Sequence, residues 1–245
     1  MKKRLTLLVS SFCSVSFLGV ASVASGADLI SPSSLNLTLR EGEQFTLRKI
    51  VTVGEEVGGT AQLDIAFLTD TTGSMGGFIN TVQTSFSDIL EATSELGDVQ
   101  WSVGEYRDIT DDFIYRLNED FTADQLAVTN GINMYSAAGG GDLPEANFFA
   151  LEETATVPSW RTGSTRLAVW AGDAVGHDPR NGSTEASATA ALQAQNIVVQ
   201  AINLLNPGQG IDQFGQATRV ADATGGSVQN NPEDVVDAIA IRNDL

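Results

Sequence analysis

Asp70, Thr72 and Ser74 alternate along one short segment, Asp70-Thr71-Thr72-Gly73-Ser74. This spacing lets a single tight turn direct one carboxylate and two hydroxyl groups at the same point. Carboxylate and hydroxyl oxygens are hard ligands, which suit Mg²⁺ or Ca²⁺. Taken alone, an aspartate after an apolar run is usually a turn or cap residue, so a metal site needs further acidic residues nearby.

Two other segments supply acidic residues. Glu145 follows the glycine-rich stretch 139–144, and Asp173 follows the apolar run 167–170. In open α/β sheets, ligands bind just beyond the carboxyl ends of the strands. Asp173 on a neighbouring strand and Glu145 from the glycine-rich loop can therefore complete an oxygen site with Asp70. We predict one dominant Mg²⁺ or Mn²⁺ site at this edge.

The elements that must position these residues form an α/β pattern. From Leu63 onward, apolar runs alternate with helical patterns, which is typical of βαβ units and predicts a doubly wound, mostly parallel sheet with helices on both faces. The expected strands are 63–68, 101–106, a short edge strand at 113–117, 167–170, 197–205 and a last one at Val228. The expected helices begin near residues 79, 122, 144, 184, 213 and 231.

Local signals predict where some of these helices begin and end. Thr122 with Gln125 has the pattern of a capping box that opens a helix. Pro144 suits the first turn of the next helix, which we expect to run to about Thr156. Gly225 suits a left-handed residue that ends a helix over 213–224.

The first residues read as an export signal. Three basic residues, Lys2 to Arg4, precede an uncharged run that extends to about Val23, and this asymmetry predicts a signal peptide over residues 1–27. The alternative is an uncleaved membrane anchor, although the run has only about the minimum spanning length. Residues 28–60 alternate as strands do, which predicts a β-hairpin or half of a β-sandwich module, and residues 61–245 form the main domain.

Charge and cysteine content narrow the function classes. The single cysteine, Cys13, is lost with the signal, so the mature chain forms neither a disulfide nor a thiolate site. Cleavage after Ala27 leaves 10 Lys and Arg against 31 Asp and Glu, a net charge of −21. Such a chain is a poor partner for nucleic acid. We expect a secreted, periplasmic or surface protein with no membrane span in its mature form; the oligomeric state is left open.

Residues 70–74 resemble the first segment of the metal-ion-dependent adhesion site of von Willebrand factor A (vWA) domains, D-x-T-x-S. The resemblance extends over about 61–242, with closest likeness in motif to integrin β-subunit domains and bacterial exported vWA proteins. It implies that one metal is bound, directly or through water, by Asp70, Thr72, Ser74, Glu145 and Asp173. It also implies a non-enzymatic binding module whose metal accepts an Asp or Glu carboxylate from a protein partner.

The same resemblance implies a second, weaker Ca²⁺ site, held by Asp108, Asp142, the Pro144 carbonyl and a second oxygen of Glu145. Three carboxylates around one divalent ion leave a net negative charge, which a second cation would offset. In this chain Gly140 replaces the asparagine ligand of the family. The alternative is that Asp108 pairs with Arg107 or caps a turn.

The resemblance departs from the integrin pattern in one further place. Gly76 and Gly77 stand where integrin β domains carry acidic residues for another regulatory calcium, so we expect that site to be absent. The single histidine, His177, lies near the same edge, and we expect it to pack or hydrogen-bond because hard cations rarely take imidazole.

Two other functions are consistent with an acidic sheet edge. A haloacid-dehalogenase-type phosphohydrolase also uses an Asp after the first strand together with Mg²⁺, but it needs a second acid where this chain has Thr72. It also needs a lysine near the phosphate, and the only lysine of the mature chain is Lys49, ahead of the sheet. The other is a structural surface protein in which the metal only stiffens the fold.

The charge asymmetry of the first residues generates a test of export. The mature N-terminus should be Ser25 or Asp28, because small residues that suit cleavage precede both positions. N-terminal sequencing of the native protein checks this expectation. Recovery of intact Met1 from a membrane fraction would show an anchor instead.

Overall fold

The computed structural model describes residues 29–31, 50–52, 62–94, 96–141, 143–205 and 209–230. The chain divides into two units, Met1–Gly59 and Thr60–Leu245. In the first, β1 (Leu29–Ser31) and β2 (Ile50–Thr52) pair as antiparallel strands. The predicted signal peptide, the alternating residues 35–47 and the helix predicted after Asn231 lie outside the described residues. None of the described helices is long and apolar enough to cross a membrane.

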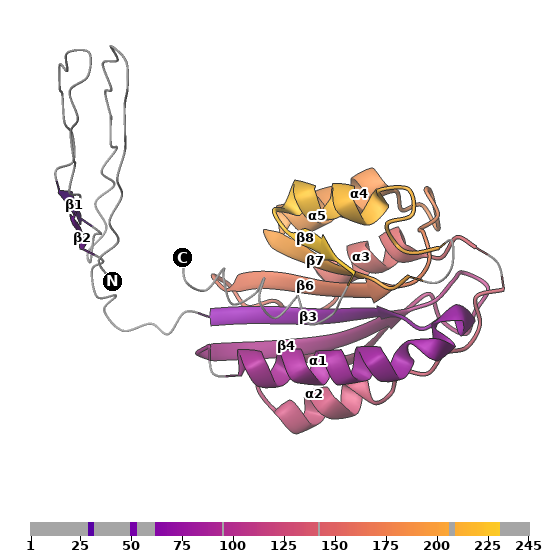
Figure 1. Ribbon diagram of the computed structural model, residues 1–245, viewed down its shortest axis with the longest axis horizontal. Helices are drawn as coiled ribbons and strands as arrows, with labels where there is room; N and C mark the ends of the chain where they lie inside the picture. The colour runs from indigo at the N-terminus through magenta and orange to yellow at the C-terminus, as the bar shows by residue number, and fades with distance from the viewer. Residues whose placement is uncertain are drawn as a thin grey trace, which may run out of the picture. The chain divides into compact units, whose positions relative to one another are not determined.

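A six-stranded sheet forms the centre of the second unit, in the order β5-β4-β3-β6-β7-β8 (Figure 1). All neighbours are parallel except β5, which runs antiparallel to β4 at the edge. Helices cover both faces, so the predicted doubly wound, vWA- or Rossmann-like architecture is confirmed. The strands are β3 (Gln62–Asp70), β4 (Asp98–Tyr106), β5 (Tyr115–Thr122), β6 (Thr165–Gly172), β7 (Ile197–Asn203) and β8 (Ser227–Gln229).

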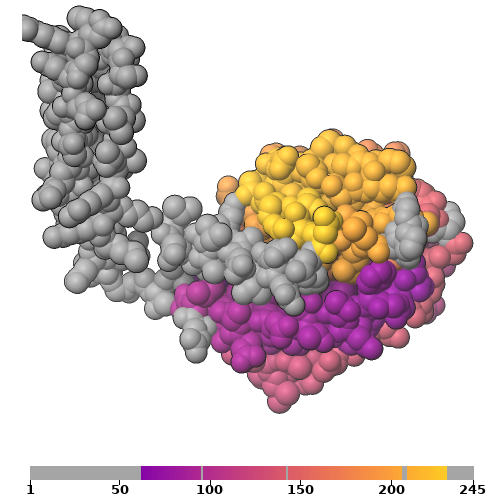
Figure 2. Space-filling model, viewed as in Figure 1, coloured from indigo at the N-terminus to yellow at the C-terminus, as the bar shows by residue number. Residues whose placement is uncertain are grey.

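Two hydrophobic clusters divide the helices between the faces of the sheet. Residues of α1 (Ile79–Thr93) and α2 (Gln125–Ile132) pack with one set of strand side chains. Residues of α3 (Asn147–Thr156), α4 (Glu185–Ala194) and α5 (Gln216–Thr224) pack with the other. Figure 2 shows the purple surface of the α1 region and the yellow surface of the α5 and β8 region on opposite sides of this unit.

The core of the first face follows from helical periodicity. Val82, Phe86 and Ile89 recur at the spacing that places side chains on one side of α1, and all three are buried. Phe86 stacks on Phe67 of β3, with ring centroids 4.4 Å apart. Because β3 is packed on both faces, it reads as a continuous apolar run and not as an alternating one.

The start of α2 differs from the predicted capping box. Thr122 is the last residue of β5, and Asp124 is the N-cap, whose side chain accepts hydrogen bonds from the Leu126 and Ala127 N–H groups. The Thr122 hydroxyl accepts the N–H of Asp124. β5 therefore runs through Thr122, beyond the short strand predicted at 113–117, because pairing with β4 continues to that residue.

The start of α3 also differs, since the helix begins at Asn147 and not near Pro144. The Glu145 N–H donates to the Val175 carbonyl at 2.9 Å, and the His177 N–H donates to the Glu145 carbonyl at 2.8 Å. These bonds hold Glu145 in an extended bridge beside Gly176, so it cannot take part in a first helical turn. The predicted end of α5 is confirmed, because Gly225 caps it with φ +79°.

Candidate metal centre

The carboxyl ends of β3 and β6 lie side by side and carry the first predicted ligands. Asp70 is the last residue of β3, and Asp173 directly follows β6. The turn after Asp70 leads into a short 3-10 helix, η1 (Gly73–Gly77), which contains Ser74. The parallel pairing of β3 with β6 therefore brings together residues about a hundred positions apart in the sequence.

Hydrogen bonds join four of the predicted ligands into one connected set. The Thr72 hydroxyl donates to Asp70 Oδ1 at 2.7 Å. The hydroxyls of Thr72 and Ser74 lie 3.3 Å apart. Ser74 Oγ in turn donates to Asp173 Oδ1 at 2.8 Å. The alternating spacing read from the sequence thus directs two hydroxyls and two carboxylates at one region.

Thr71, between the ligands, points the other way. Its hydroxyl donates to Glu105 Oε2 at 2.8 Å, while Arg116 binds Glu105 Oε1 at 2.7 Å. Glu105 is fully buried in β4, so this network anchors the turn to the neighbouring strand. The anchor holds Thr72 and Ser74 toward Asp173.

The fifth predicted ligand, Glu145, reaches the same region from the glycine-rich loop. The Gly73 N–H donates to the Gly139 carbonyl at 3.1 Å, which ties this loop to the Asp70 turn. A Cβ on Gly140 would lie 2.6 Å from Thr72 Cβ and 2.9 Å from Glu145 Oε1. Both side chains therefore border the same small space, and the Glu145 residue is buried.

Burial and mutual repulsion set the electrostatics of this cluster. Burial raises the pKa of Asp70 to about 7, hydrogen bonds from Thr72 oppose the shift, and the charges of Asp173 and Asp111 add to it. The pKa of the Tyr106 hydroxyl is also well above its usual value, first through burial and then through the charges of Asp70, Glu145 and Asp173. The three predicted acidic ligands therefore share one buried environment around Tyr106.

The donor set suits a hard divalent cation. Asp70 Oδ2 is buried, and no hydrogen-bond partner for it lies among the described residues. A cation there would replace the missing donor and offset the repulsion between the carboxylates. Within the described part of the chain, no three acidic, His or Cys side chains gather into a metal-binding group on their own. The Thr72 and Ser74 hydroxyls lie between the acids, and they belong to the donor set.

The residues predicted for a second metal have a different arrangement. Asp108 is fully buried, and Arg180 binds both of its oxygens, with Nε 2.8 Å from Oδ1 and the terminal nitrogen on Oδ2. Arg107 instead donates to the carbonyls of Thr71 and Ser136. Asp142 lies outside the described residues, so the structure does not test the second calcium site that the resemblance implies.

Sequence reasoning missed Arg180 and Asp111 as members of this edge. Hydrogen bonds from Arg180 lower the pKa of Asp108 below its ordinary value although burial acts in the opposite direction. The Nε2 atom of His177 lies 4.0 Å from Asp108 Oδ2. A basic residue seven positions after Asp173 was the only signal in the sequence, and nothing there connects it with Asp108.

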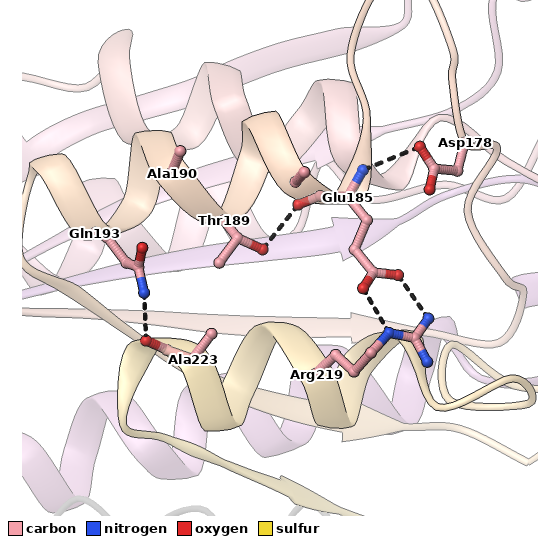
Figure 3. A pocket seen from close by; sticks show the side chains of 8 residues that line it. Asp178, Glu185, Thr189, Ala190, Gln193, Arg219 and Ala223 are labelled. Atoms are coloured by element: carbon pink, nitrogen blue, oxygen red, sulfur yellow. Dashed lines mark hydrogen bonds and ion pairs between the residues drawn. The ribbon is translucent and has the colours of Figure 1, made fainter.

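A shallow depression of about 500 Å³ lies between α4 and α5 (Figure 3). Arg219 and Glu185 form an ion pair across it, with Nε and Oε1 2.5 Å apart, and Gln193 donates to the Ala223 carbonyl. Its other lining residues are mostly small, and none of the predicted metal ligands lines it. We therefore place the candidate site at the sheet edge.

Comparison with known proteins supports the fold. Neither a protein family nor a curated protein matches the sequence. Solved structures with a similar fold include BatB from Bacteroides thetaiotaomicron, described as a conserved hypothetical protein, with a TM-score of 0.54 and 10% identity over 75% of this chain and 100% of that one. Another is the pilus adhesin SpaC from Lactobacillus rhamnosus GG, with a TM-score of 0.53 and 12% identity over 78% of this chain and 31% of that one.

The close approach of Gly140 to two ligands generates a stability test. Gly140 has φ +64°, and an added Cβ would meet Thr72 and Glu145. Gly140→Ala should therefore lower the free energy of unfolding by about 1–3 kcal/mol in urea denaturation. Gly141→Ala is the matched control, because nothing lies within 4 Å of its added Cβ. Equal stability of the two variants would show that the loop does not pack as described.

Proposed function

We propose that this chain is an exported, metal-dependent protein-binding module of the vWA type. The observation that carries the proposal is the connected set at the sheet edge, in which Thr72 and Ser74 link the Asp70 and Asp173 carboxylates. Glu145 borders the same space from the glycine-rich loop. Carboxylates and hydroxyls without a soft ligand favour Mg²⁺ or Mn²⁺.

In this proposal Asp70, Thr72, Ser74, Glu145 and Asp173 hold the metal directly or through water. When bound, Mg²⁺ supplies a strongly hydrated positive charge whose open position an Asp or Glu carboxylate of a partner can fill. The chain's own residues keep the site fixed, because Ser74 belongs to η1 and Glu145 is held beside Gly176. A rigid site loses little conformational entropy when a partner binds.

A binding role fits these residues better than hydrolysis of a phosphate ester. A haloacid-dehalogenase-type phosphohydrolase would require an acid in place of Thr72. Here the Thr72 hydroxyl instead donates a hydrogen bond to Asp70. Export is supported by the charge asymmetry of residues 1–23. The likeness of the fold to SpaC, an adhesin, agrees with a role in attachment.

The clustered oxygens generate a metal-binding test. Calorimetric titration of the mature protein should show one dominant Mg²⁺ or Mn²⁺ site, and Asp70→Ala or Asp173→Ala should abolish it. Both variants should remain folded by circular dichroism, since neither side chain belongs to the hydrophobic clusters. Asp88→Ala, which removes an exposed acid on α1, is the control and should bind as the wild type does. Unchanged affinity in both edge variants would contradict the site.

Partner capture tests the binding role separately. Tagged wild-type protein in Mg²⁺ should retain a protein from the native extracellular fraction, and chelator or Asp70→Ala should release it, because the partner's carboxylate needs the metal. The captured protein should lose binding when its contacting Asp or Glu is replaced by Asn or Gln. Metal binding together with capture that is indifferent to chelator would point to a metal that only stiffens the fold.

A further inference from the structure

The ion pair between Asp108 and Arg180 lies next to the proposed metal centre. Asp108 follows β4, which is adjacent to β3, and its carboxylate is fully buried. Arg180 comes from the loop that follows Asp173, 72 residues further along the chain. A buried carboxylate is costly unless a positive charge and hydrogen bonds compensate it, and here the guanidinium provides both.

Two hydrogen bonds connect this pair, through Asp111, with Gly140 of the loop beside the proposed metal ligands. The Asp108 N–H donates to Asp111 Oδ2 at 3.0 Å, and the Gly140 N–H donates to the same oxygen at 2.9 Å. Gly140 in turn lies so close to Thr72 and Glu145 that an added Cβ would meet both side chains. Asp108 and Asp111 therefore belong to the same acidic edge as the metal ligands.

The loop that carries Arg180 is itself fixed at both ends. The Arg180 N–H donates to the Ser183 carbonyl at 2.8 Å, and the Ser183 N–H donates back to the Arg180 carbonyl at 2.9 Å. Ser183 Oγ donates to Glu152 of α3 at 2.6 Å. On the other side, His177 bonds to the Glu145 backbone. The guanidinium is thus held on Asp108 by the fold, and its side chain is only 21% exposed.

We propose that Arg180 is a built-in counter-cation, which stands where the acidic edge would otherwise require a second divalent ion. A single divalent metal leaves negative charge uncompensated when Asp108 and Asp111 are added to the three acidic ligands. Arg180 supplies one of the missing positive charges. The part of the proposal that concerns metal affinity rests on the proposed function, whereas the compensation of Asp108 does not.

The chemistry of the guanidinium suits this role. Its planar fork binds both oxygens of a carboxylate, and it stays charged at any physiological pH. A calcium ion at the same place would bind and dissociate as the calcium concentration changed. The wild-type edge should therefore hold one exchangeable metal, and its affinity for an acidic partner should not respond to calcium once Mg²⁺ is bound.

Calcium titration in saturating Mg²⁺ tests the proposal. Wild-type protein should show no second binding event, whereas Arg180→Ala should gain one Ca²⁺ per chain, and Asp108→Asn in that background should remove it again. Arg219→Ala, which breaks the exposed pair with Glu185 between α4 and α5, is the matched control and should gain none. Arg180→Lys should keep the positive charge and gain none.

Thermal unfolding keeps the test decisive if Arg180→Ala is too unstable to titrate. In saturating Mg²⁺, calcium should then raise the melting temperature of Arg180→Ala and leave that of wild type and Arg219→Ala unchanged. Either of two results overturns the proposal: a second calcium event in the wild type that Asp108→Asn removes, or an Arg180→Ala variant that neither binds nor is stabilised by calcium. If the wild type binds no Mg²⁺, the proposed function is contradicted. Calcium binding by wild type and Arg180→Ala, compared without Mg²⁺, would still decide the role of Arg180.

Discussion

Burial of carboxylates at the carboxyl edge of a parallel sheet is the constraint on which the site depends. The edge receives Asp70 at the end of β3, Asp108 after β4 and Asp173 after β6, because parallel strands all end on the same side. Loops cover these ends and remove the charges from water, which disfavours the ionised forms. Each carboxylate must therefore find hydrogen-bond donors or a positive charge, and the loops are arranged to supply them.

The way in which each acid is compensated separates structural from functional roles. Asp64 is bound by Arg161, Glu105 by Arg116, and Asp108 by Arg180. In contrast, Asp70 Oδ1 accepts hydrogen bonds from the Thr72 N–H and hydroxyl, and the pKa of Asp70 is raised to about 7. An exchangeable cation stabilises the protein most where a buried carboxylate is incompletely compensated. Among the described carboxylates, Asp70 is such a case.

The hydrophobic core allows the protein to tolerate a cluster of buried carboxylates at this edge. β3 and β6 are packed on both faces by two separate hydrophobic clusters, so the strand ends hold their positions without help from the site. Glycines then allow the loops to approach closely: Gly172 leaves no room for a Cβ beside Asp70 and Tyr106, and Gly140 leaves none beside Thr72. Stability therefore comes mainly from the sheet and helices. This allows acidic side chains to gather at the edge.

Local patterns in the sequence determined the sheet, the helices and the positions of Asp70, Thr72, Ser74 and Asp173 after strands, because apolar periodicity and strand order depend on neighbouring residues. They failed at the start of α3, where Glu145 pairs with Gly176, and at the start of α2, where Asp124 replaces Thr122 as the cap. Nor could they show Arg180 on Asp108. Only the tertiary structure decided these features. The pairing of β5 with β4 continues to Thr122, and the partners of Glu145 and Arg180 lie tens of residues away in the sequence. No local spacing encodes which elements meet.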